Sequence, residues 1–334
     1  MKQRVSVLDT DLTLRIEERE VPQPGQDEVL VQIKSVGVCG SDIHYFEHGR
    51  IADFVVEQPL VLGHESSGVV TAIGDNVTDL EVGTTVAMEP GVPCGRCQQC
   101  RAGRYNLCPD VEFFATPPID GAFCEYVVLP RDFVHPVPSH VSYDAAALVE
   151  PLSVGVWACQ KANVSLGTRV LITGGGPIGA ICALVARARG ADVVGVSDIN
   201  SERRERVAQL GFPAIDPVSG DIPEADVLLE CSGAAAAIDQ GIRALAPAGI
   251  AVLIGMAPTD TVQVPVGVIQ GKEIWLTGTF RYANTYPSAI DLVSSGKVDL
   301  DALVSAHYSL DQVEKALTHG AEHPADMKVI VRVL

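Results

Sequence analysis

The glycine-rich segment at residues 174–179 constrains the fold of this chain more than any other feature of its sequence. It reads Gly-Gly-Gly-Pro-Ile-Gly, follows the apolar run 170–173 and opens a helix that we predict over residues 178–189. Glycines in this frame let the backbone approach a pyrophosphate, and the start of the helix offers it free N–H groups. The segment therefore predicts a strand–turn–helix unit that binds a dinucleotide.

The sequence around this segment alternates strands with helices. Beyond the strand at 170–173, we predict strands at 193–197, 227–230 and 250–254 and a second helix at 201–210. Apolar strands that alternate with helices are typical of parallel βαβ units whose sheet is buried on both faces. The second half of the chain is thus predicted to be a doubly wound parallel sheet.

Asp198 follows the predicted strand at 193–197 and bears on the choice of cofactor. A carboxylate at this place accepts hydrogen bonds from the adenosine ribose and repels the 2′-phosphate of NADP, so the prediction is NAD. Alternatively, Asp198 caps a helix or a turn, and Arg203 lies on a solvated helix face instead of contacting the adenosine. The predicted cofactor-binding residues are Gly174, Gly176, Pro177, Ile178, Gly179, Asp198 and Arg203.

The first 150 residues read as mostly β-structure. Short apolar or alternating runs recur at 29–33, 67–72, 84–88 and 122–129, with glycine and proline between them. We expect a small barrel or sandwich there, with an irregular cysteine-rich insertion at 90–109. The tail carries a predicted helix at 311–320 and a predicted strand at 328–333, and we expect it to return to the first domain.

The charge of the chain argues against two classes of partner. There are 24 Lys and Arg residues and 42 Asp and Glu residues, which gives a net charge of −18. Such a surface repels nucleic-acid phosphates and anionic lipid headgroups, so neither is an expected partner. Glycines and a proline interrupt the uncharged stretch 170–186, and the N-terminus has no apolar signal core. We expect a cytoplasmic protein.

Four of the nine cysteines crowd into one segment. A disulfide framework is not expected in a reducing compartment, so the crowding suggests a metal. Four thiolates give zinc a closed tetrahedral shell that leaves no position for substrate, whereas an iron–sulfur cluster is the competing interpretation. Arginines near the cysteines and the long gap before the last one favour a structural zinc. The predicted ligands are Cys94, Cys97, Cys100 and Cys108.

A second candidate metal site is dispersed along the chain. Its residues are Cys39, His64, Glu65 and Glu150. One thiol, one imidazole and carboxylates from separate segments suit a catalytic zinc that keeps a position for water or substrate. Taken singly, each has an ordinary structural explanation as a core, turn or solvated residue.

Several motifs together resemble one known family. They are GVCGSDIHYFEHGRI, GHESSG, the four-cysteine lobe ending in GRYNLC, LVEPLSVGV and GGGPIGA. They resemble the medium-chain dehydrogenase/reductases and, within these, the zinc-dependent polyol branch. The resemblance implies an α/β protein with a GroES-like β-rich catalytic domain at 1–149 and 277–334, including a structural zinc lobe at about 90–109. A Rossmann NAD-binding domain would lie at 150–276, with the active site in the cleft between the domains.

The resemblance also implies roles at the metal. Cys39, His64 and Glu65 would ligate the catalytic zinc, with Glu150 approaching it directly or through a bound water. Related alcohol dehydrogenases usually place a cysteine at this last position, so Glu150 favours the polyol branch. Ser41 is predicted either to pass the alcohol proton outward, with His44 as a candidate relay partner, or to be a turn hydroxyl.

The predicted activity is NAD-dependent oxidation of a polyol, such as sorbitol or xylitol, to a ketose by zinc-assisted hydride transfer. The family further implies two zinc ions per subunit and a homotetramer. Three alternatives remain: a dehydrogenase of simple secondary alcohols or amino alcohols, a zinc- and NAD-binding protein without turnover, and a zinc-free quinone reductase. The candidate zinc ligands argue against the last two. Because a polyol pocket needs polar groups beyond the metal, the predicted substrate-binding residues are Tyr45, Phe113, Thr116, Glu150, Arg281 and Tyr282. Against this, Tyr45 would be a core residue and Arg281 would bind only the cofactor or a surface carboxylate.

Overall fold

The computed structural model describes residues 1–257, 259 and 261–333 and divides the chain into two compact units. The first unit is Met1–Glu150 together with Tyr286–Leu334, and the second is Pro151–Thr285. The first unit is therefore built from two segments that are far apart in the sequence. Buried apolar side chains form a separate core in each unit.

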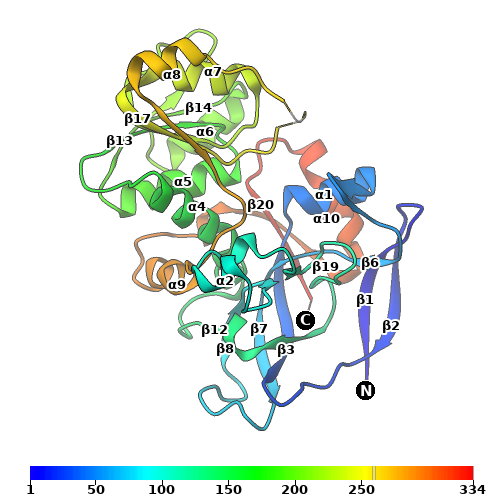
Figure 1. Ribbon diagram of the computed structural model, residues 1–334. Helices are drawn as coiled ribbons and strands as arrows, with labels where there is room; N and C mark the ends of the chain where they lie inside the picture. Colours follow the sequence, from blue (N-terminus) through cyan, green and yellow to red (C-terminus); the bar gives the residue numbers. More distant parts are fainter. Residues whose placement is uncertain (258, 260, 334) are drawn as a thin grey trace. The chain divides into compact units, whose positions relative to one another are not determined.

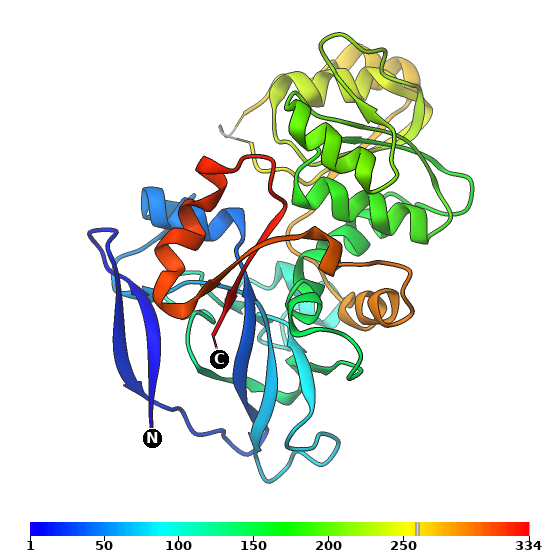
Figure 2. The same ribbon diagram turned by 180° about the vertical axis from the view of Figure 1, so that it is seen from behind.

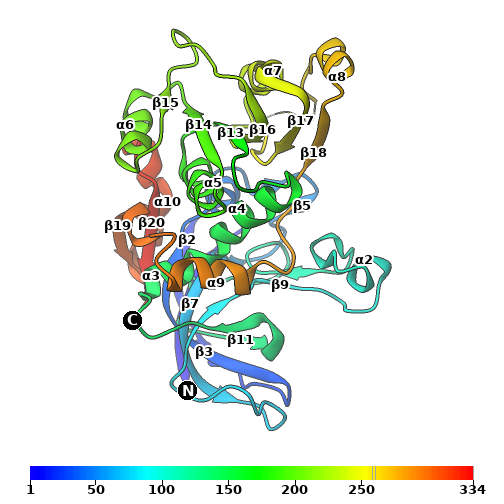
Figure 3. The same ribbon diagram turned by 90° about the vertical axis from the view of Figure 1, so that its left-hand side faces the viewer.

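The second unit is built on a six-stranded parallel sheet with the order β15-β14-β13-β16-β17-β18, which Figure 3 shows from left to right. Its strands are β13 (Arg169–Thr173), β14 (Asp192–Ser197), β15 (Ala214–Ile215), β16 (Ala225–Glu230), β17 (Leu245–Leu253) and β18 (Trp275–Gly278). The strand order reverses between β13 and β16. That reversal marks the place where open α/β sheets bind ligands, at the carboxyl ends of the strands.

Helices connect the strands of this sheet. They are α5 (Pro177–Ala188), α6 (Ser201–Gln209), α7 (Ala235–Ala244) and α8 (Val266–Lys272). The chain moves one way from β13 through β14 to β15 and the opposite way from β16 through β17 to β18. Right-handed crossovers therefore place α5 and α6 on one face and α7 and α8 on the other. The predicted doubly wound parallel sheet is confirmed.

The sheet extends further along the sequence than the pattern indicated. The alternation of apolar strands with helices is no longer visible in the sequence after Lys272, yet β18 pairs in parallel with β17. The backbone N–H of Thr279 then donates a hydrogen bond to the carbonyl of Leu253. This pairing is why the second unit continues to residue 285. The pattern failed there because β18 is an edge strand with three of its four residues exposed.

The first unit contains two main sheets. Strands β2 (Leu14–Glu20), β1 (Lys2–Leu8) and β6 (Leu60–Val61) form a three-stranded sheet in that order. The larger sheet has the order β12-β8-β7-β3-β20-β19, with β11 also paired to β3. Its strands are β3 (Glu28–Gly37), β7 (Glu65–Ile73), β8 (Thr85–Met88), β11 (Tyr126–Pro130), β12 (Val134–Pro136), β19 (Val304–Ser309) and β20 (Lys328–Arg332). The predicted β-rich character of this part is confirmed.

The C-terminal segment returns to this larger sheet. In Figure 2, β20 runs beside β3, and the two are antiparallel, with Ile330 opposite Gly37 and Arg332 opposite Ser35. The pairing carries Lys328 from the end of the chain to the amino-terminal half of the unit. The expected return of the tail is confirmed, and it places a lysine near residues more than 250 positions earlier in the sequence.

Helices and short strands complete the first unit. The helices are α1 (Gly40–His48), α2 (Gln98–Arg101), α3 (Tyr143–Ala147), α9 (Tyr286–Ser294) and α10 (Val313–Glu322), and α4 (Val149–Lys161) begins at the junction of the units. The short strands β4 (Arg50–Ile51) and β5 (Phe54–Val55) pair with each other, as do β9 (Gly91–Val92) and β10 (Glu112–Phe113). Short 3₁₀ turns occupy Tyr105–Leu107, Arg131–Phe133, Asp301–Leu303 and Leu310–Gln312. Of the helices in the described part of the chain, none has the length and apolar character needed to cross a membrane.

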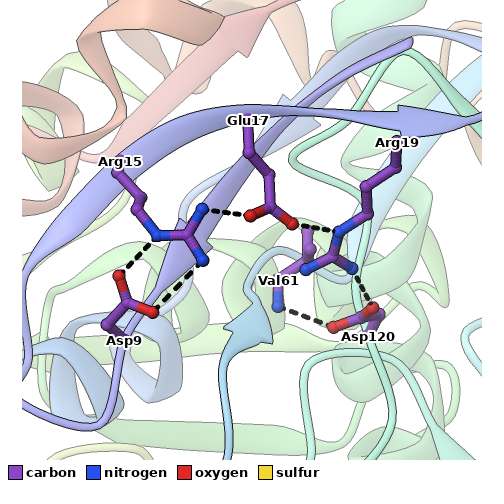
Figure 4. Close-up of polar contacts among 6 residues, drawn as sticks. All are labelled: Asp9, Arg15, Glu17, Arg19, Val61 and Asp120. Carbon is purple, nitrogen blue, oxygen red and sulfur yellow. Dashed lines mark hydrogen bonds and ion pairs between the residues drawn. The ribbon is translucent and has the colours of Figure 1, made fainter. Parts of the chain in front are cut away.

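The hairpin of β1 and β2, which Figure 1 shows in dark blue, carries a row of ion pairs on its surface. Arg15 binds Asp9 and Glu17, and Arg19 binds Glu17 and Asp120 (Figure 4). The other oxygen of Asp120 accepts a hydrogen bond of 2.8 Å from the backbone N–H of Val61. Exposed ion pairs contribute little stability individually, so we expect this row to add little to the stability of the fold.

Candidate metal centres and dinucleotide site

Three of the dispersed residues meet in the first unit. Cys39 is the residue before α1, and His64 and Glu65 stand at the beginning of β7. Their ligand atoms, one sulfur, one ring nitrogen and one carboxylate oxygen, all lie within 4.8 Å of one another. Cys39 is partly exposed, whereas His64 and Glu65 are buried. The cluster thus has one side open and two ligands fixed in the interior.

The position of Glu65 depends on a glycine in the neighbouring strand. Gly37 on β3 pairs with Glu65 on β7, and a Cβ at Gly37 would lie 2.1 Å from Oε2 of Glu65. Only glycine therefore leaves room for this carboxylate. Oε1 accepts a hydrogen bond of 2.7 Å from Nζ of Lys328. Oε2 lies 2.6 Å from the same nitrogen without the geometry of a hydrogen bond, and it has no hydrogen-bond partner among the described residues. A buried carboxylate oxygen in this state fits a metal ligand.

Asp42 supports two of the three ligands and was not predicted. It is fully buried in α1, and Oδ2 accepts a hydrogen bond of 3.0 Å from the backbone N–H of Cys39. Oδ1 accepts one of 2.9 Å from the N–H of Gly63 and lies 3.5 Å from Nδ1 of His64. A carboxylate at Nδ1 orients a histidine so that Nε2 can bind a metal. The available signal was the Cys-x-x-Asp spacing, which matches a helix capping box.

Lys328 was also missed. Its ammonium group is buried at the start of β20 and donates to the carbonyl of Val38 at 2.8 Å as well as to Glu65. Burial lowers the pKa of this lysine, but Glu65, Cys39 and Glu150 raise it above its usual value. Lys328 is therefore a buried cation within the field of the site. An alternating strand predicts a lysine on its solvent face, so this placement could not be predicted from the local pattern.

The surroundings favour a positive charge in the cluster. Burial lowers the pKa of His64, but the charges of Asp42 and Cys39 outweigh it and raise that pKa well above its usual value. Three acidic groups, Cys39, Glu65 and Glu150, act on the one buried ammonium group of Lys328, and a fourth, Asp42, acts on His64. Such an excess of negative charge suits a divalent cation, and Cys, His and Glu are ligands that zinc takes. The residues present therefore fit a zinc ion.

Glu150 and Ser41 lie on helices beside this cluster. Glu150 is buried in the first turn of α4, and its charge acts on Lys328, but it is not in the group within 4.8 Å among the described residues. Ser41 lies in the first turn of α1. His44 lies one turn further along α1, where its ring packs edge-on against His48 with the centroids 4.6 Å apart.

Three of the predicted substrate residues belong to the first unit. The ring of Phe113, on β10, lies 5.7 Å from the ring of His64, which brings an apolar wall to the cluster. Thr116 follows in the turn that contains Pro117 and Pro118, and it is half-buried. Tyr45 is buried on α1 and contributes to the apolar core of the unit.

The other two predicted substrate residues, Arg281 and Tyr282, follow β18 in the second unit. Arg281 has a left-handed backbone with φ of 52°, and its guanidinium lies 4.9 Å from the ring centroid of Phe280. A non-glycine residue in this conformation is held there by its surroundings.

The four clustered cysteines form a separate lobe of the first unit. Their sulfurs all lie within 4.8 Å of one another, and the residues are Cys94, Cys97, Cys100 and Cys108. They belong to the segment of sequence that joins the paired strands β9 and β10. Backbone N–H groups of Cys94 and Cys100 point at sulfurs of the cluster at 3.4 Å. Hydrogen bonds from the N–H groups of Arg96 and Cys97 lower the pKa of Cys94 to about 7. Four converging sulfurs supported in this way fit a closed tetrahedral zinc site.

A buried carboxylate attaches this lobe to the larger sheet. Glu89 follows β8 and accepts hydrogen bonds from the hydroxyl of Tyr105, at 2.6 Å, and from Nε2 of His135, at 3.0 Å. Tyr105 belongs to the turn between the third and fourth cysteines, and His135 lies on β12. Glu89 therefore links the lobe to β12 of the larger sheet.

The dinucleotide residues surround one cavity of about 380 Å³ in the second unit. It lies at the carboxyl ends of β13, β14 and β16, where the strand order reverses. Gly174 has φ of 89°, and a Cβ at Gly179 would lie 1.8 Å from the carbonyl oxygen of Gly174, so both positions need glycine. All seven predicted residues line the cavity, together with Ser197, Ile199, Pro217, Cys231, Ser232, Ala234 and Ala237.

Asp198 is built into the rim of this cavity. Oδ2 accepts a hydrogen bond of 2.7 Å from the N–H of Gly175, and Oδ1 accepts one of 2.8 Å from the N–H of Asn200. Arg203 lies 3.9 Å from Oδ2. The residue that caps α6 is Asn200. Each oxygen of Asp198 keeps further acceptor capacity, so its role in shaping the turn leaves it able to accept a hydroxyl group.

A second carboxylate shapes the opposite wall and was not predicted. Glu230 is buried at the end of β16 and accepts hydrogen bonds from the N–H and hydroxyl of Ser232, the N–H of Gly233 and the hydroxyl of Thr173. The turn after β16 is thereby fixed around one buried charge. The sequence showed an acidic residue at the end of a strand, but no pattern indicates that its partners are backbone groups.

Comparison with known proteins agrees with both units. The family model described as the alcohol dehydrogenase GroES-like domain matches residues 25–139, and that described as zinc-binding dehydrogenase matches residues 177–295. The sorbitol dehydrogenase of Bacillus subtilis is 39% identical over 341 residues, covering 98% of this chain and 96% of the relative. The sorbitol dehydrogenase of Homo sapiens is 40% identical and covers 91% of this chain and 88% of the relative.

A solved structure shares the fold over nearly its whole length. The L-idonate 5-dehydrogenase of Escherichia coli aligns with a TM-score of 0.94 at 29% sequence identity, covering 99% of this chain and 98% of that one. The predicted GroES-like and Rossmann architecture is confirmed. This chain belongs to the zinc-dependent medium-chain dehydrogenase/reductase family, among the relatives of the sorbitol dehydrogenases.

Proposed function

We propose that this protein oxidises a polyol to a ketose with NAD and a catalytic zinc. One observation carries the proposal: Cys39, His64 and Glu65 converge in an acidic, partly open cluster in a chain that is 39% identical to a sorbitol dehydrogenase. The alternative of a binding protein without turnover has no use for such a cluster. A second, closed cysteine cluster would suffice to stabilise the fold.

The residues of the cluster would hold the metal and set its charge. A zinc ion supplies a Lewis acid that stabilises an alkoxide. Asp42 orients the imidazole of His64, and Lys328 compensates the charge of Glu65. Glu150 adds a carboxylate near the cluster that suits either metal or substrate hydroxyl. Ser41, two residues after Cys39 in the sequence, is the proposed path for the alcohol proton.

The cavity of the second unit is proposed to hold NAD. The nicotinamide supplies the hydride acceptor, and the protein supplies its position. The N-terminus of α5 and the glycines of the 174–179 segment would receive the pyrophosphate. Asp198 would accept the ribose hydroxyls and disfavour a 2′-phosphate, because the two negative charges repel each other.

Polar side chains beyond the metal ligands would set the preference for polyols. We assign this role to Glu150, Thr116, Tyr45, Arg281 and Tyr282, with Phe113 as an apolar wall. Arg281 has a left-handed backbone, and strained backbone of this kind clusters at functional sites. Polar groups left unpaired by a simple alcohol would penalise it by a few kcal/mol, or about 10²-fold in kcat/KM.

We also propose a homo-oligomer, with a tetramer as the family expectation, and a cytoplasmic location. The oligomer is supported by β18, the last strand of the parallel sheet, whose Trp275 is 75% exposed. An exposed apolar edge strand is a surface that proteins cover by pairing. The net charge of −18 argues against anionic lipids and nucleic acids as partners.

The proposed activity is tested by comparing kcat/KM for sorbitol, xylitol and 2-butanol with NAD and with NADP. We expect a polyol with NAD to be the best pair. Arg281→Ala should reduce the polyol preference more than it slows 2-butanol, and Arg243→Ala, an exposed arginine of α7, is the matched control. Equal kcat/KM on 2-butanol would move the enzyme to the secondary-alcohol branch, and preference for NADP would remove the role given to Asp198.

A further inference from the structure

Four of the nine cysteines lie outside both metal clusters. Cys124 belongs to the first unit, and Cys159, Cys182 and Cys231 belong to the second. Cys159 on α4 and Cys182 on α5 are completely buried, whereas Cys231, directly after β16, is partly exposed. Cys231 lines the cavity proposed for the dinucleotide. Of these three thiols, it is therefore the one that a small molecule in the cavity meets.

Cys231 and Cys182 are direct neighbours. Their sulfurs are 3.8 Å apart, with Cys231 donating to Cys182. A disulfide needs a separation of about 2.0 Å, so the two sulfurs must approach by somewhat less than 2 Å. Cys231 directly follows β16 at the carboxyl end of the sheet, and its partly exposed side chain is the one that must rotate to make this approach. Cys182 is fixed within α5.

The two thiols differ in the roles they can take. The hydrogen bond with Cys231, together with burial, raises the pKa of Cys182 well above its usual value, which keeps it a thiol. Oxidants attack the thiolate of an accessible cysteine, and a nearby second cysteine then resolves the product. Because Cys231 is the accessible thiol, we expect it to react with the oxidant first, and Cys182 to resolve the product.

We propose that Cys231 is a site of reversible oxidation by a small hydroperoxide, that Cys182 resolves it to a disulfide, and that a dinucleotide in the cavity shields it. In the first step the Cys231 thiol takes one peroxide oxygen to become a sulfenic acid, and the peroxide leaves as an alcohol or water. In the second step the sulfur of Cys182 displaces that oxygen, which leaves with the two protons as water. The peroxide is reduced by two electrons and the thiol pair is oxidised by two.

The disulfide would act on the cofactor site because of what surrounds it. It would tie the turn after β16 to α5, and this turn carries Ser232, which also lines the cavity. Glu230 holds the same turn in its present form through Ser232 and Gly233. A bond that pulls Cys231 toward α5 works against this arrangement. Weaker binding of NAD is the expected consequence, and a thiol reductant should restore it.

Peptide mapping tests the proposal directly. The zinc-loaded protein is treated with hydrogen peroxide, alkylated and digested with trypsin, which places Cys182 in the peptide 170–187, Cys231 in 207–243 and Cys159 in 132–161. We expect the peptides 170–187 and 207–243 to be joined, and to separate after reduction. In Cys182→Ser, we expect no joined peptide and trapping of a sulfenic acid at Cys231 by dimedone. Cys159→Ala, a matched buried thiol, should still give the joined peptide.

Shielding by the dinucleotide rests on the proposed function, so NAD binding is measured on the same samples by fluorescence. At a free NAD concentration of about 100 times Kd, about 1% of the cavities are open, and the rate of disulfide formation should fall about 100-fold. Absence of the joined peptide, or a peptide 132–161 joined to 170–187 in its place, would overturn the inference. If the disulfide forms at the same rate with and without bound NAD, the oxidant does not reach Cys231 through the cavity, and that part of the inference is overturned. Failure to bind NAD would count against the proposed function alone.

Discussion

The two candidate metal centres of the first unit differ in how their ligands are supplied. The lobe takes four cysteines from one segment of the chain, at 94, 97, 100 and 108, and its surroundings add backbone N–H groups. The other centre takes Cys39, His64 and Glu65 from separate elements and surrounds them with a buried aspartate and a buried lysine. The four sulfurs of the lobe would fill all the coordination positions of a tetrahedral zinc. The dispersed centre supplies fewer ligands. It surrounds them with buried charges, Asp42 beside His64 and Lys328 beside Glu65.

This difference indicates what each centre is for. A closed site stabilises a segment that has little core of its own, because metal binding and folding are then the same event. An open site needs a rigid frame that holds the ligands before the metal or substrate arrives. The strand pair of β3 and β7, with Gly37 opposite Glu65, is such a frame. We therefore expect the two centres to fail differently, which the following substitutions examine.

Replacing Cys39 should have the largest effect on activity. Cys39→Ser removes the one thiolate of the open centre, so we expect turnover to be abolished and about one equivalent of zinc to be lost. The fold should persist, since α1, β3 and β7 keep their packing. Zinc analysis, kinetics and circular dichroism measure the three quantities. Cys124→Ser, which also removes a thiol from the first unit, is the control and should keep both metals.

Replacing Cys100 should have the largest effect on stability. Cys100→Ser opens the closed shell, and a zinc held at about 1,000 times its Kd contributes about 4 kcal/mol to folding. We expect the lobe to lose order and the thermal midpoint to fall, with activity lost only as the fold or assembly is lost. Thermal unfolding followed together with turnover checks this. Full stability with one zinc missing would show that the lobe does not depend on its metal.

Removing the charge of Asp42 should weaken the open centre without dismantling it. Asp42→Asn keeps the shape of the side chain but changes the group that orients His64, and losses of this kind cost about 10- to 100-fold in metal affinity or activity. We expect a lower zinc affinity, measured by competition with a chromophoric chelator, and an unchanged metal content in the lobe. Asp11→Asn, on the exposed hairpin, is the control and should change neither quantity.

Replacing Asp144 should change the stability of the first unit without changing either candidate metal cluster, since Asp144 belongs to neither. Burial raises its pKa, but hydrogen bonds from Arg332, Ser35 and His307 outweigh burial and lower it. A lowered pKa stabilises the fold above the unfolded-state pKa of about 3.9, and this contribution disappears as the pH falls through the folded-state value. Asp144→Asn should therefore cost about 1–2 kcal/mol at pH 7. The difference from the unsubstituted protein should shrink as the pH falls below about 3.9 and through the folded-state value, as thermal unfolding measured across this pH range will show.

The sequence predicted those parts of the fold that have a strong local pattern. The strands β13, β14 and β16 and the helices α5 and α6 were predicted within a few residues, because buried parallel strands and glycine turns leave distinct signatures. The edge strand β18 was missed because its exposed side chains break the pattern. The helix α1 was not predicted, since Cys39 and the residues after it were interpreted for their chemistry and not for helix periodicity.

At the candidate site, the sequence could indicate ligand types but not their supporting residues. Cys39, His64 and Glu65 stand out because of their chemistry. Asp42 and Lys328 do not, because an aspartate near a helix start and a lysine in a terminal strand have common structural uses. Their roles arise from pairing across the sheet, which brings Lys328 to Glu65. Register between distant strands is not encoded in any local pattern.

A chelator titration tests the division of roles between the two centres most directly. The zinc-loaded protein is treated with increasing dipicolinate, and zinc content, polyol-dependent NAD reduction and thermal unfolding are measured on the same samples. We predict two equivalents of zinc, of which the first leaves with all turnover and little change in the thermal midpoint, and the second leaves only with unfolding. Turnover that survives loss of the first zinc, or simultaneous loss of both with the fold, would contradict the account.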